Sequence, residues 1–467
     1  MNIRVLRTEL KRSVAPWAGV LALMTALAFL YLLNGSWWRG TTAWTAQWTS
    51  LALWTRTLLF YLWPLAVGLG ALQGLRDHRS KMSELLTTTS RPARHRAATL
   101  AGTTAITLVS AFALVIGLGA IQVLVNTGYT HLRWLPISLV GALALVAGAA
   151  LGMGAGRALP SALTPPALAI GAFVFLTLVQ TWLGRTDTTG TTGVPSSEPN
   201  RVSLLSPAIE GVPNALVTLS ASVHVGQTIW LLGMAVTGFA LLVAATPRTR
   251  LLALTPVLAG AALALLVLPS DPRRMYVLDE AAAELVCDGP VCVTEQHRAR
   301  LADLAGPGKE ALRRLRGALG SQAPDTIREN TAVLPDGATP RWSHRTVIFG
   351  FDDDIIAAAQ GEGLTEALIG KGMVPGCAPV AVGWSEFGND EFARTVAAGW
   401  VLGDLKPLPG TGSAGVRRHV IARALPVWKE LQALPRDEQL ARIDAMRAAA
   451  LSCEGDAFDA LEAGGSR

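Results

Sequence analysis

The feature that most constrains this chain is a series of seven long apolar runs that contain no Asp, Glu, Lys or Arg. A helix needs about 20 predominantly apolar residues to cross the hydrocarbon core of a bilayer. The runs therefore predict seven transmembrane helices in a sequence of which 51% is hydrophobic. Their expected ranges are 17–34, 58–75, 100–125, 134–155, 163–183, 225–245 and 251–268.

Charge divides the chain into two parts. Residues 1–270 contain 18 Lys and Arg against 6 Asp and Glu, whereas residues 271–467 contain 22 against 28. The basic balance of the whole chain thus reflects loops on one side of a membrane, and it gives no reason to expect nucleic acid as a partner. We expect a polytopic α-helical membrane protein with an appended acidic C-terminal domain.

The basic residues also predict orientation, because cytoplasmic loops carry the excess of Lys and Arg. The N-terminus and the connections that alternate with it contain 13 basic residues, and the opposite set contains 5. The N-terminus is therefore expected in the cytoplasm. With seven spans, residues 271–467 would form an extracytoplasmic domain at the plasma membrane.

The cysteines agree with that placement. All four, Cys287, Cys292, Cys377 and Cys453, lie beyond the last apolar run. An even number confined to one domain favours disulfides in an oxidising compartment. The pairing Cys287–Cys292 with Cys377–Cys453 is one of three connectivities; a zinc site and unpaired buried thiols are the alternatives.

One basic segment, residues 78–102, lies between the second and third apolar runs and reads HRSKMSELLTTTSRPARHRAATLAG. Residues 83–89 are long enough for about two turns of interfacial helix. Ser90-Arg91-Pro92 would end this helix, because a residue before proline avoids the α region. An ordinary cytoplasmic loop whose arginines only set topology is the alternative, but topology does not require the Ser-Glu-Leu-Leu-Thr block.

The segment resembles the coupling helix of ABC-2 type transporter permeases, and the resemblance covers about residues 1–250. Met82-Ser83 and Thr89 stand where that family often has Gly-Thr and Pro. In the family, this loop docks on a separate ATPase subunit. The matching residues here are Lys81, Ser83, Glu84, Leu85, Leu86, Thr88, Thr89, Ser90, Arg91 and Arg94.

The resemblance implies three regions: a six-span permease-like domain (1–250), an added seventh span (251–270) and the outer domain (271–467). It also implies a cytoplasmic ABC ATPase subunit as partner, and a second permease protomer in a homodimer or heterodimer among membrane lipids. ATP would be bound by the ATPase, so this chain is expected to be a non-enzymatic transport subunit without a cofactor. The substrate would be an exported amphiphile, peptide or lipid-like compound.

The outer domain is predicted to be mainly helical with a small sheet. Helices are expected at 296–319, with a break or kink at Gly306-Pro307-Gly308, and at 352–369, 386–402, 416–434 and 437–451, with a strand at 346–350. It resembles outer domains of some actinobacterial membrane proteins loosely related to metallopeptidases, but the sequence contains no HExxH, GxSxG or P-loop motif. A membrane-anchored enzyme or sensor is therefore the alternative function.

Tryptophans, one arginine and a group of glycines also have predicted structural roles. Trp37, Trp38, Trp44 and Trp48 are expected to form an interfacial aromatic belt. Arg56, just before the second run, is expected to extend to the outer surface. Gly141, Gly148, Gly152, Gly154 and Gly156 would allow helices to pack closely.

Overall fold

A computed structural model describes residues 15–79, 93–181, 185–187, 196–198, 201–209, 214–271, 274–332, 342–377 and 389–462. The chain forms two compact units. Among the described residues, those up to Leu278 form the membrane unit and those from Asp279 onward form the C-terminal unit. Tyr276–Leu278 (β4) belongs to the membrane unit because it pairs there with Val217–Leu219 (β3).

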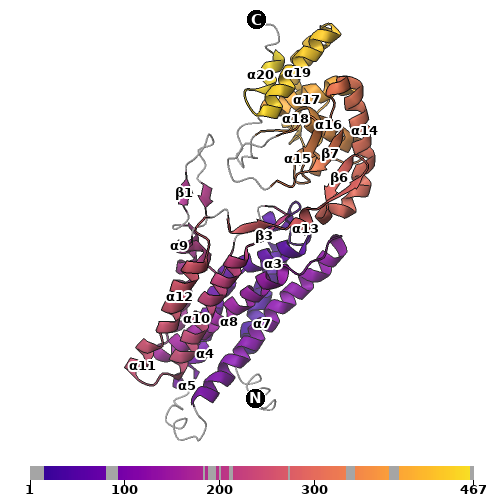
Figure 1. The fold of residues 1–467 in the computed structure, drawn as a ribbon. Coiled ribbons are helices and arrows are strands. Elements are labelled where there is room, and N and C mark those ends of the chain that lie inside the picture. Colours follow the sequence, from indigo (N-terminus) through magenta and orange to yellow (C-terminus); the bar gives the residue numbers. More distant parts are fainter. Residues whose placement is uncertain are drawn as a thin grey trace. The chain divides into compact units, whose positions relative to one another are not determined.

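The membrane unit is a helical bundle (Figure 1). Every predicted apolar run coincides with a helix, since a bilayer leaves the backbone no other way to satisfy its polar groups within one segment. The helices are α2 (Ala15–Leu32), α3 (Trp48–Thr57), α4 (Leu59–Gly74), α5 (Arg76–Arg79), α7 (Ala93–Asn126), α8 (Trp134–Ala158), α9 (Thr164–Thr181), α10 (Ala221–Val243), α11 (Pro247–Leu252) and α12 (Thr255–Val267). Short 3₁₀ turns lie at Ser36–Trp38 (η1) and Ser203–Leu205 (η2), and Arg185–Asp187 (β1) pairs with Ser196–Glu198 (β2).

Four helical segments of the described residues are long and apolar enough to cross a membrane: α7, α8, α10 and the α11–α12 segment. A fifth candidate is the pair α3 and α4, which meet at an angle of 49°. Helices α2 and α9 are apolar but shorter. The structure thus describes a mainly helical, multi-pass membrane protein with four to five candidate spans.

Helix α8 occupies the centre of the bundle and packs against α3, α4, α7 and α10. Glycines make this possible by letting backbones approach one another. A Cβ atom on Gly152 would overlap the carbonyl oxygen of Val67 in α4, and one on Gly154 would overlap that of Gly238 in α10. The predicted role of the α8 glycines in close packing is confirmed.

The tryptophans of the first connection form a packed cluster, so the expected belt is wrong for those that are buried. Trp44 is 0% exposed and Trp48 is 8% exposed. Trp48 stacks on Trp134 of α8 with ring centroids 5.2 Å apart, and the Trp54 indole donates to the carbonyl of Thr42 at 2.9 Å. Trp44 and Trp48 are buried and their rings pack against other aromatic side chains, so these residues belong to the core, although their indole N–H groups have no hydrogen-bond partner among the described residues.

The C-terminal unit is mainly helical around one small sheet, as predicted. Its strands are Leu285–Asp288 (β5), Val291–Thr294 (β6), Thr326–Glu329 (β7) and Thr346–Phe349 (β8), in the order β5-β6-β7-β8. The first pair is antiparallel and the other two pairs are parallel. The helices are α13 (Glu280–Ala283), η4 (Glu295–Arg300), α14 (Leu301–Leu319), η5 (Gly320–Gln322), α15 (Asp354–Ala357), α16 (Glu362–Met373), α17 (Asn389–Leu402), α18 (Ala414–Ala433), α19 (Arg436–Ser452) and α20 (Ala457–Glu462).

Two helix predictions in this unit are wrong in detail. Helix α14 continues through Pro307 without the break that was one of the two expectations for this position, the other being a kink. Gly308 packs directly against Val291 of β6, and a tertiary contact of this kind outweighs the local cost of proline. The helix expected at 352–369 is divided into α15 and α16 at Gly361, whose φ of 55° favours glycine.

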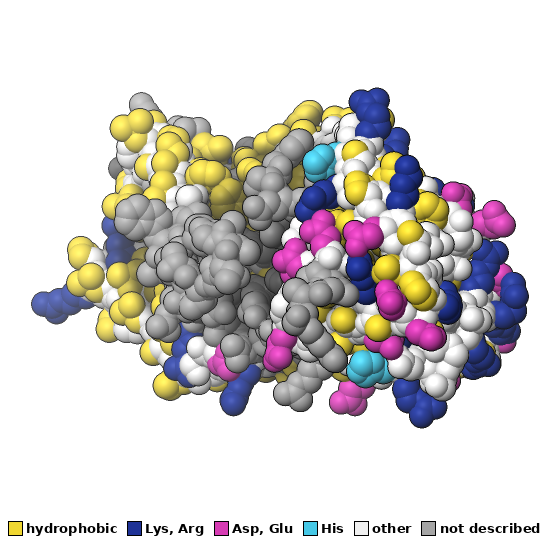
Figure 2. Space-filling view, turned by 90° about the horizontal axis from the view of Figure 1, so that it is seen from above, with side chains coloured by type: hydrophobic (Ala, Val, Ile, Leu, Met, Phe, Trp, Pro, Cys, Tyr) yellow, Lys and Arg dark blue, Asp and Glu magenta, His cyan; other side chains and the backbone are white. Residues whose placement is uncertain are grey.

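Both predicted disulfides are present and all four cysteines are paired. Cys287–Cys292 joins opposed residues of the β5–β6 hairpin. Cys377–Cys453 joins the segment after α16 to the end of α19 across 76 positions of sequence. Charged side chains of both signs are interspersed over the surface of this unit, on the right of Figure 2.

The two disulfides should contribute unequally to stability. A cross-link that closes a longer loop removes more entropy from the unfolded chain, which gives about 4 kcal/mol for Cys377–Cys453 and about 2 kcal/mol for Cys287–Cys292 in the chain-entropy account. We expect the C377A/C453A protein to lose more free energy of unfolding than the C287A/C292A protein. Urea-dependent proteolysis of the full chain in detergent measures this, and an equal or reversed order would contradict it.

The glycine contacts of α8 predict a position-specific effect of one methyl group. Gly152→Ala should lower the stability of the bundle by about 1–3 kcal/mol, because the helices must separate to admit the Cβ atom. Gly171→Ala in α9 is the matched control, since a Cβ atom there meets no atom within 4 Å. Thermal denaturation in detergent distinguishes the two variants. Equal midpoints would show that the α4–α8 approach does not limit stability.

Candidate functional site

The predicted coupling segment lies almost entirely outside the described residues, which resume at Ala93. This applies to Lys81, Ser83, Glu84, Leu85, Leu86, Thr88, Thr89, Ser90 and Arg91. Arg94 is described: it lies in the first turn of α7 and is exposed. In the sequence the segment follows α5 and precedes α7, and α5 lies at the lower end of the bundle in Figure 1.

A buried cation lies at the other end of the bundle, and the prediction that Arg56 extends to the outer surface is wrong. Arg56 belongs to the last turn of α3 and is 0% exposed. Its Nη2 atom donates to the carbonyl oxygen of Pro207 at 2.8 Å and to Oε1 of Gln227 at 2.9 Å. The guanidinium therefore joins α3 to α10 and to the segment 203–209.

The acceptors around Arg56 are themselves fixed. The Gln227 amide nitrogen donates to the carbonyls of Leu204 and Ser206 at 2.9 and 3.1 Å, which also identifies its oxygen as the atom facing Arg56. Thr57 donates to the carbonyl of Ile209 at 2.6 Å. Side chains of α3 and α10 thus donate hydrogen bonds to backbone carbonyl oxygens of segment 203–209, which do not pair in a β-sheet.

Pairing of the guanidinium is incomplete. The Nε and Nη1 atoms of Arg56 are buried and have no hydrogen-bond partner among the described residues. The Nδ1 atom of His224, one turn before Gln227 on α10, is also buried without a partner there. Unsatisfied buried donors and unpaired buried charges are costly, so this cluster is a strong candidate for a functional role.

A second candidate site lies in the C-terminal unit, where the parallel strands end. Glu329 is the last residue of β7 and is 6% exposed. One carboxylate oxygen accepts hydrogen bonds from the backbone N–H and hydroxyl of Thr294, at the end of β6, at 2.7 and 2.9 Å. The other lies 2.6 Å from Nδ1 of His297. Open sheets with parallel strands often bind ligands at this edge.

The His297–Glu329 pair has a defined chemistry. A carboxylate accepts, so Nδ1 of His297 carries the proton and Nε2 remains able to accept or donate elsewhere. The imidazole packs edge-on against Phe351, with ring centroids 4.9 Å apart. The hydroxyl of Thr294 is engaged by Glu329, so it is a second donor to the carboxylate and not a free nucleophile. The described residues contain no cluster of three His, Cys, Asp or Glu able to hold a metal ion.

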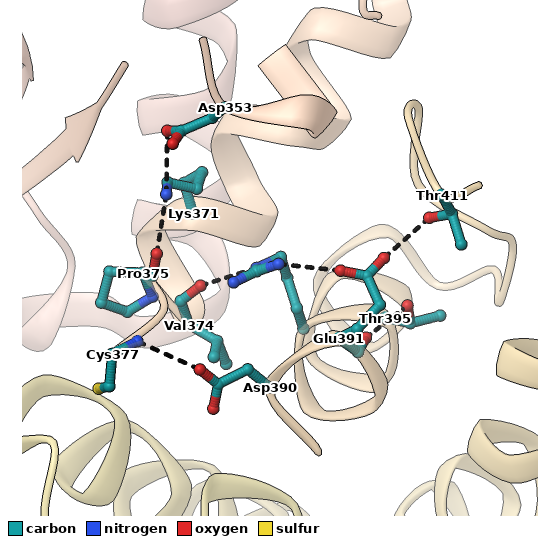
Figure 3. Close-up of polar contacts among 10 residues, drawn as sticks. Asp353, Lys371, Val374, Pro375, Cys377, Asp390, Glu391, Thr395 and Thr411 are labelled. Atoms are coloured by element: carbon teal, nitrogen blue, oxygen red, sulfur yellow. Dashed lines mark hydrogen bonds and ion pairs between the residues drawn. The ribbon is translucent and has the colours of Figure 1, made fainter. Parts of the chain in front are cut away.

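Elsewhere in this unit, the buried Lys371 forms an ion pair with Asp353, whose side chain is 31% exposed (Figure 3). Its Nζ atom lies 3.0 Å from Oδ2 of Asp353 and donates to the carbonyl of Pro375 at 2.8 Å. Burial lowers the pKa of Lys371 below its ordinary value, although the charge of Asp353 opposes this shift. The acidic run at 352–354 was expected to begin a helix, and Asp353 does lie at the N-cap of α15. Its pairing with Lys371 was not predicted.

Figure 3 also shows a carboxylate network on α17. Glu391 accepts from the hydroxyl of Thr411 at 2.8 Å and from Nη1 of Arg394 at 2.9 Å. Arg394 in turn donates through Nε to the carbonyl of Val374, and Asp390 accepts from the backbone N–H of Cys377. The network ties α17 to the chain that follows α16, beside the Cys377–Cys453 disulfide.

No family model matches this chain, and neither the curated proteins nor the solved structures contain a match.

The lowered pKa of Lys371 predicts a pH dependence with a definite sign. The unfolded chain holds this proton more tightly than the folded protein does, so the contribution of Lys371 to stability rises with pH between its lowered pKa and the ordinary value of 10.5. The difference in unfolding free energy between wild type and Lys371→Met should therefore grow across that window. Urea-dependent proteolysis of the full chain at stepped pH measures it.

Lys406 provides a control of opposite sign. Its hydrogen bond to Glu366 raises the pKa of Lys406, so its contribution is present below 10.5 and is lost as pH rises through the raised value. The difference in free energy of unfolding between wild type and Lys406→Met should therefore decline at high pH. Parallel curves for the two variants would contradict both assignments.

Proposed function

We propose that this chain is the membrane-spanning permease subunit of an ABC-2 type transporter. A separate cytoplasmic ATPase would supply the energy, and a second permease protomer would complete the pathway. The observation that carries the proposal is the segment 78–96, whose Lys81, Glu84-Leu85-Leu86, Ser90-Arg91 and Arg94 match the coupling helix of that family. The multi-pass helical bundle around it supports the same reading.

The proposal assigns seven spans to the membrane unit. In addition to the four to five candidates defined by length, α2 and α9 would each cross the bilayer, tilted or with local thinning. Counting α3 and α4 as one broken span gives seven. The excess of basic residues in alternate connections then supports a cytoplasmic N-terminus and an extracytoplasmic C-terminal unit, where its two disulfides would be stable.

The bundle suggests how force would be transmitted. Helix α4 has 16 residues and connects α5, next to the coupling segment, with α3 at the opposite end. At 1.5 Å per residue it spans about 24 Å. Closure of the ATPases would push the coupling segment and favour one of two arrangements at the α3–α4 break. The ATPases would shift the population toward that arrangement because they bind it more tightly. Export of an amphiphile, peptide or lipid-like compound is the expected outcome.

A second candidate function is a membrane-anchored enzyme or sensor that acts through the C-terminal unit. The buried His297–Glu329 pair at the ends of parallel strands favours it, because ligand sites in such sheets often lie there. Binding or hydrolytic activity that depends on His297, but not on an ATPase, would support this alternative.

The permease proposal predicts co-purification of an ATPase. Tagged full-length protein in mild detergent should retain an ABC ATPase subunit, and replacing residues 83–91 by a Gly/Ser segment should remove it. Reversing charge with Arg91→Glu and Arg94→Glu should weaken the association by the loss of surface ion pairs. Quantitative mass spectrometry of the eluates measures the ratio of the two subunits.

Arg39→Glu is the matched control. Arg39 is exposed in the first connection, at the opposite end of the predicted topology, so reversing its charge should leave the ratio unchanged. Normal ATPase recovery with the 83–91 replacement would count against the proposal. Absence of any ATPase from folded wild-type protein would shift preference to the C-terminal unit.

A further inference from the structure

We propose that Arg56 binds the anionic group of an amphiphilic ligand, a carboxylate or phosphate on an apolar body. The inference deepens the proposed transport function by naming the charge of the substrate. Only the description of the ligand as a transported substrate rests on the proposed function. The anion-binding site itself rests on the contacts around Arg56.

The described residues leave the positive charge of Arg56 without a counter-ion. Arginine stays protonated in proteins, and Arg56 is fully buried. The two acceptors that reach it, the carbonyl of Pro207 and the amide of Gln227, are both neutral. No carboxylate of the described residues contacts it. A buried cation without a counter-ion is strongly unfavourable, so binding an anion would recover electrostatic energy.

The guanidinium of Arg56 also has hydrogen-bond donors that are not used. Nη2 is occupied, whereas Nε and Nη1 retain N–H groups that face the protein interior without acceptors among the described residues. Hydrogen bonds from a guanidinium to an anion are shorter and stronger than those to neutral acceptors. His224 adds a further unpaired polar atom three residues before Gln227, on the same face of α10.

Arg56 lies next to the 49° bend between α3 and α4, where the helix is interrupted. On one side, a Cβ atom built on Gly141 of α8 would lie 2.9 Å from the ring of Phe112 and 3.4 Å from Cγ of Arg56, so the missing side chain of Gly141 leaves room for both. On the other side lies segment 203–209, which is held by hydrogen bonds from Arg56, Thr57 and Gln227 and by the burial of its apolar side chains. A small opening of this segment would expose the free donors.

The surroundings define the rest of the ligand. The nearby core is almost entirely aliphatic, and its buried members include Ala52, Leu53, Ile137, Leu204, Leu205 and Ile209. An apolar chain would be compatible with this environment, whereas a cationic head group would be repelled by Arg56. The site therefore fits an amphiphile with an anionic group and not one whose only charge is positive.

The test uses purified full-length protein in a nonionic detergent and competition against tritiated oleate. Oleyl alcohol tests the need for charge, and oleoyl lysophosphatidate distinguishes a lipid phosphate from a carboxylate. We expect wild type to bind the better anion at least about 10-fold more tightly than the alcohol, a difference of about 1.4 kcal/mol. Arg56→Gln should abolish this preference, Arg56→Lys should retain part of it, and Arg39→Gln should leave it intact.

Two outcomes of this competition would overturn the proposal: equal binding of anion and alcohol to wild type, or equal loss of preference in Arg56→Gln and Arg39→Gln. Glu210 follows Ile209 in the sequence but lies outside the described residues. If Glu210→Gln destabilises the protein as much as Arg56→Gln, and the double variant is no worse, an internal ion pair occupies Arg56 and the proposal fails.

A measurement on wild type covers the case in which Arg56 variants do not fold. A diazirine analogue of oleate should label peptides within residues 48–58, 203–209 or 221–231, in competition with unlabelled oleate. Labelling confined to other helices would refute the site. Neither experiment requires an ATPase, so failure to recover that partner would remove the transport function while leaving the anion site standing.

Discussion

Close backbone contact between α8 and its neighbours is the constraint on which the membrane unit depends. Gly152 and Gly154 let the carbonyls of α4 and α10 approach the α8 backbone, where any side chain would overlap them. In a bilayer the hydrophobic effect does not drive helices together, so packing of this kind supplies much of the association energy. Helices α4, α8 and α10 therefore form a close-packed block, and α3 and segment 203–209 are joined to it through side chains such as Arg56 and Gln227.

The apolar runs predicted the helices of the membrane unit well, because hydrophobic length is a local property of sequence. The bend at residues 57–59 could not be predicted in this way. Searching for charge-free runs placed the start of the second span after Arg56, whereas the helical segment extends back to Trp48. The partner of Arg56 is 171 positions away on α10, and no local pattern reports such a distance. A signal was present in the apolar stretch Leu51-Ala52-Leu53-Trp54, which is separated from Arg56 only by Thr55.

In the C-terminal unit, the sequence predicted the class, most helices and the disulfide pairing, but not the buried polar groups. Lys371 stands among Leu, Ile, Gly and Met in α16, and a lone charge in such surroundings is a sign of a buried pair. Its partner Asp353 was interpreted only as the beginning of a helix. Glu329 and His297 meet because β6 and β7 are parallel neighbours, a consequence of strand order that one sequence without relatives does not reveal.

The stacked rings of Trp48 and Trp134 have an optical consequence. They join α3, which carries Arg56, to α8, which belongs to the block, at a centroid distance of 5.2 Å. Two indoles so close together couple their electronic transitions, and the coupling falls steeply as they separate. The difference in circular dichroism between wild type and Trp48→Phe would separate this coupling from those of the other close indole pairs, Trp38–Trp44 and Trp37–Trp54, and a ligand that opens the α3–α4 bend would change it without any added probe.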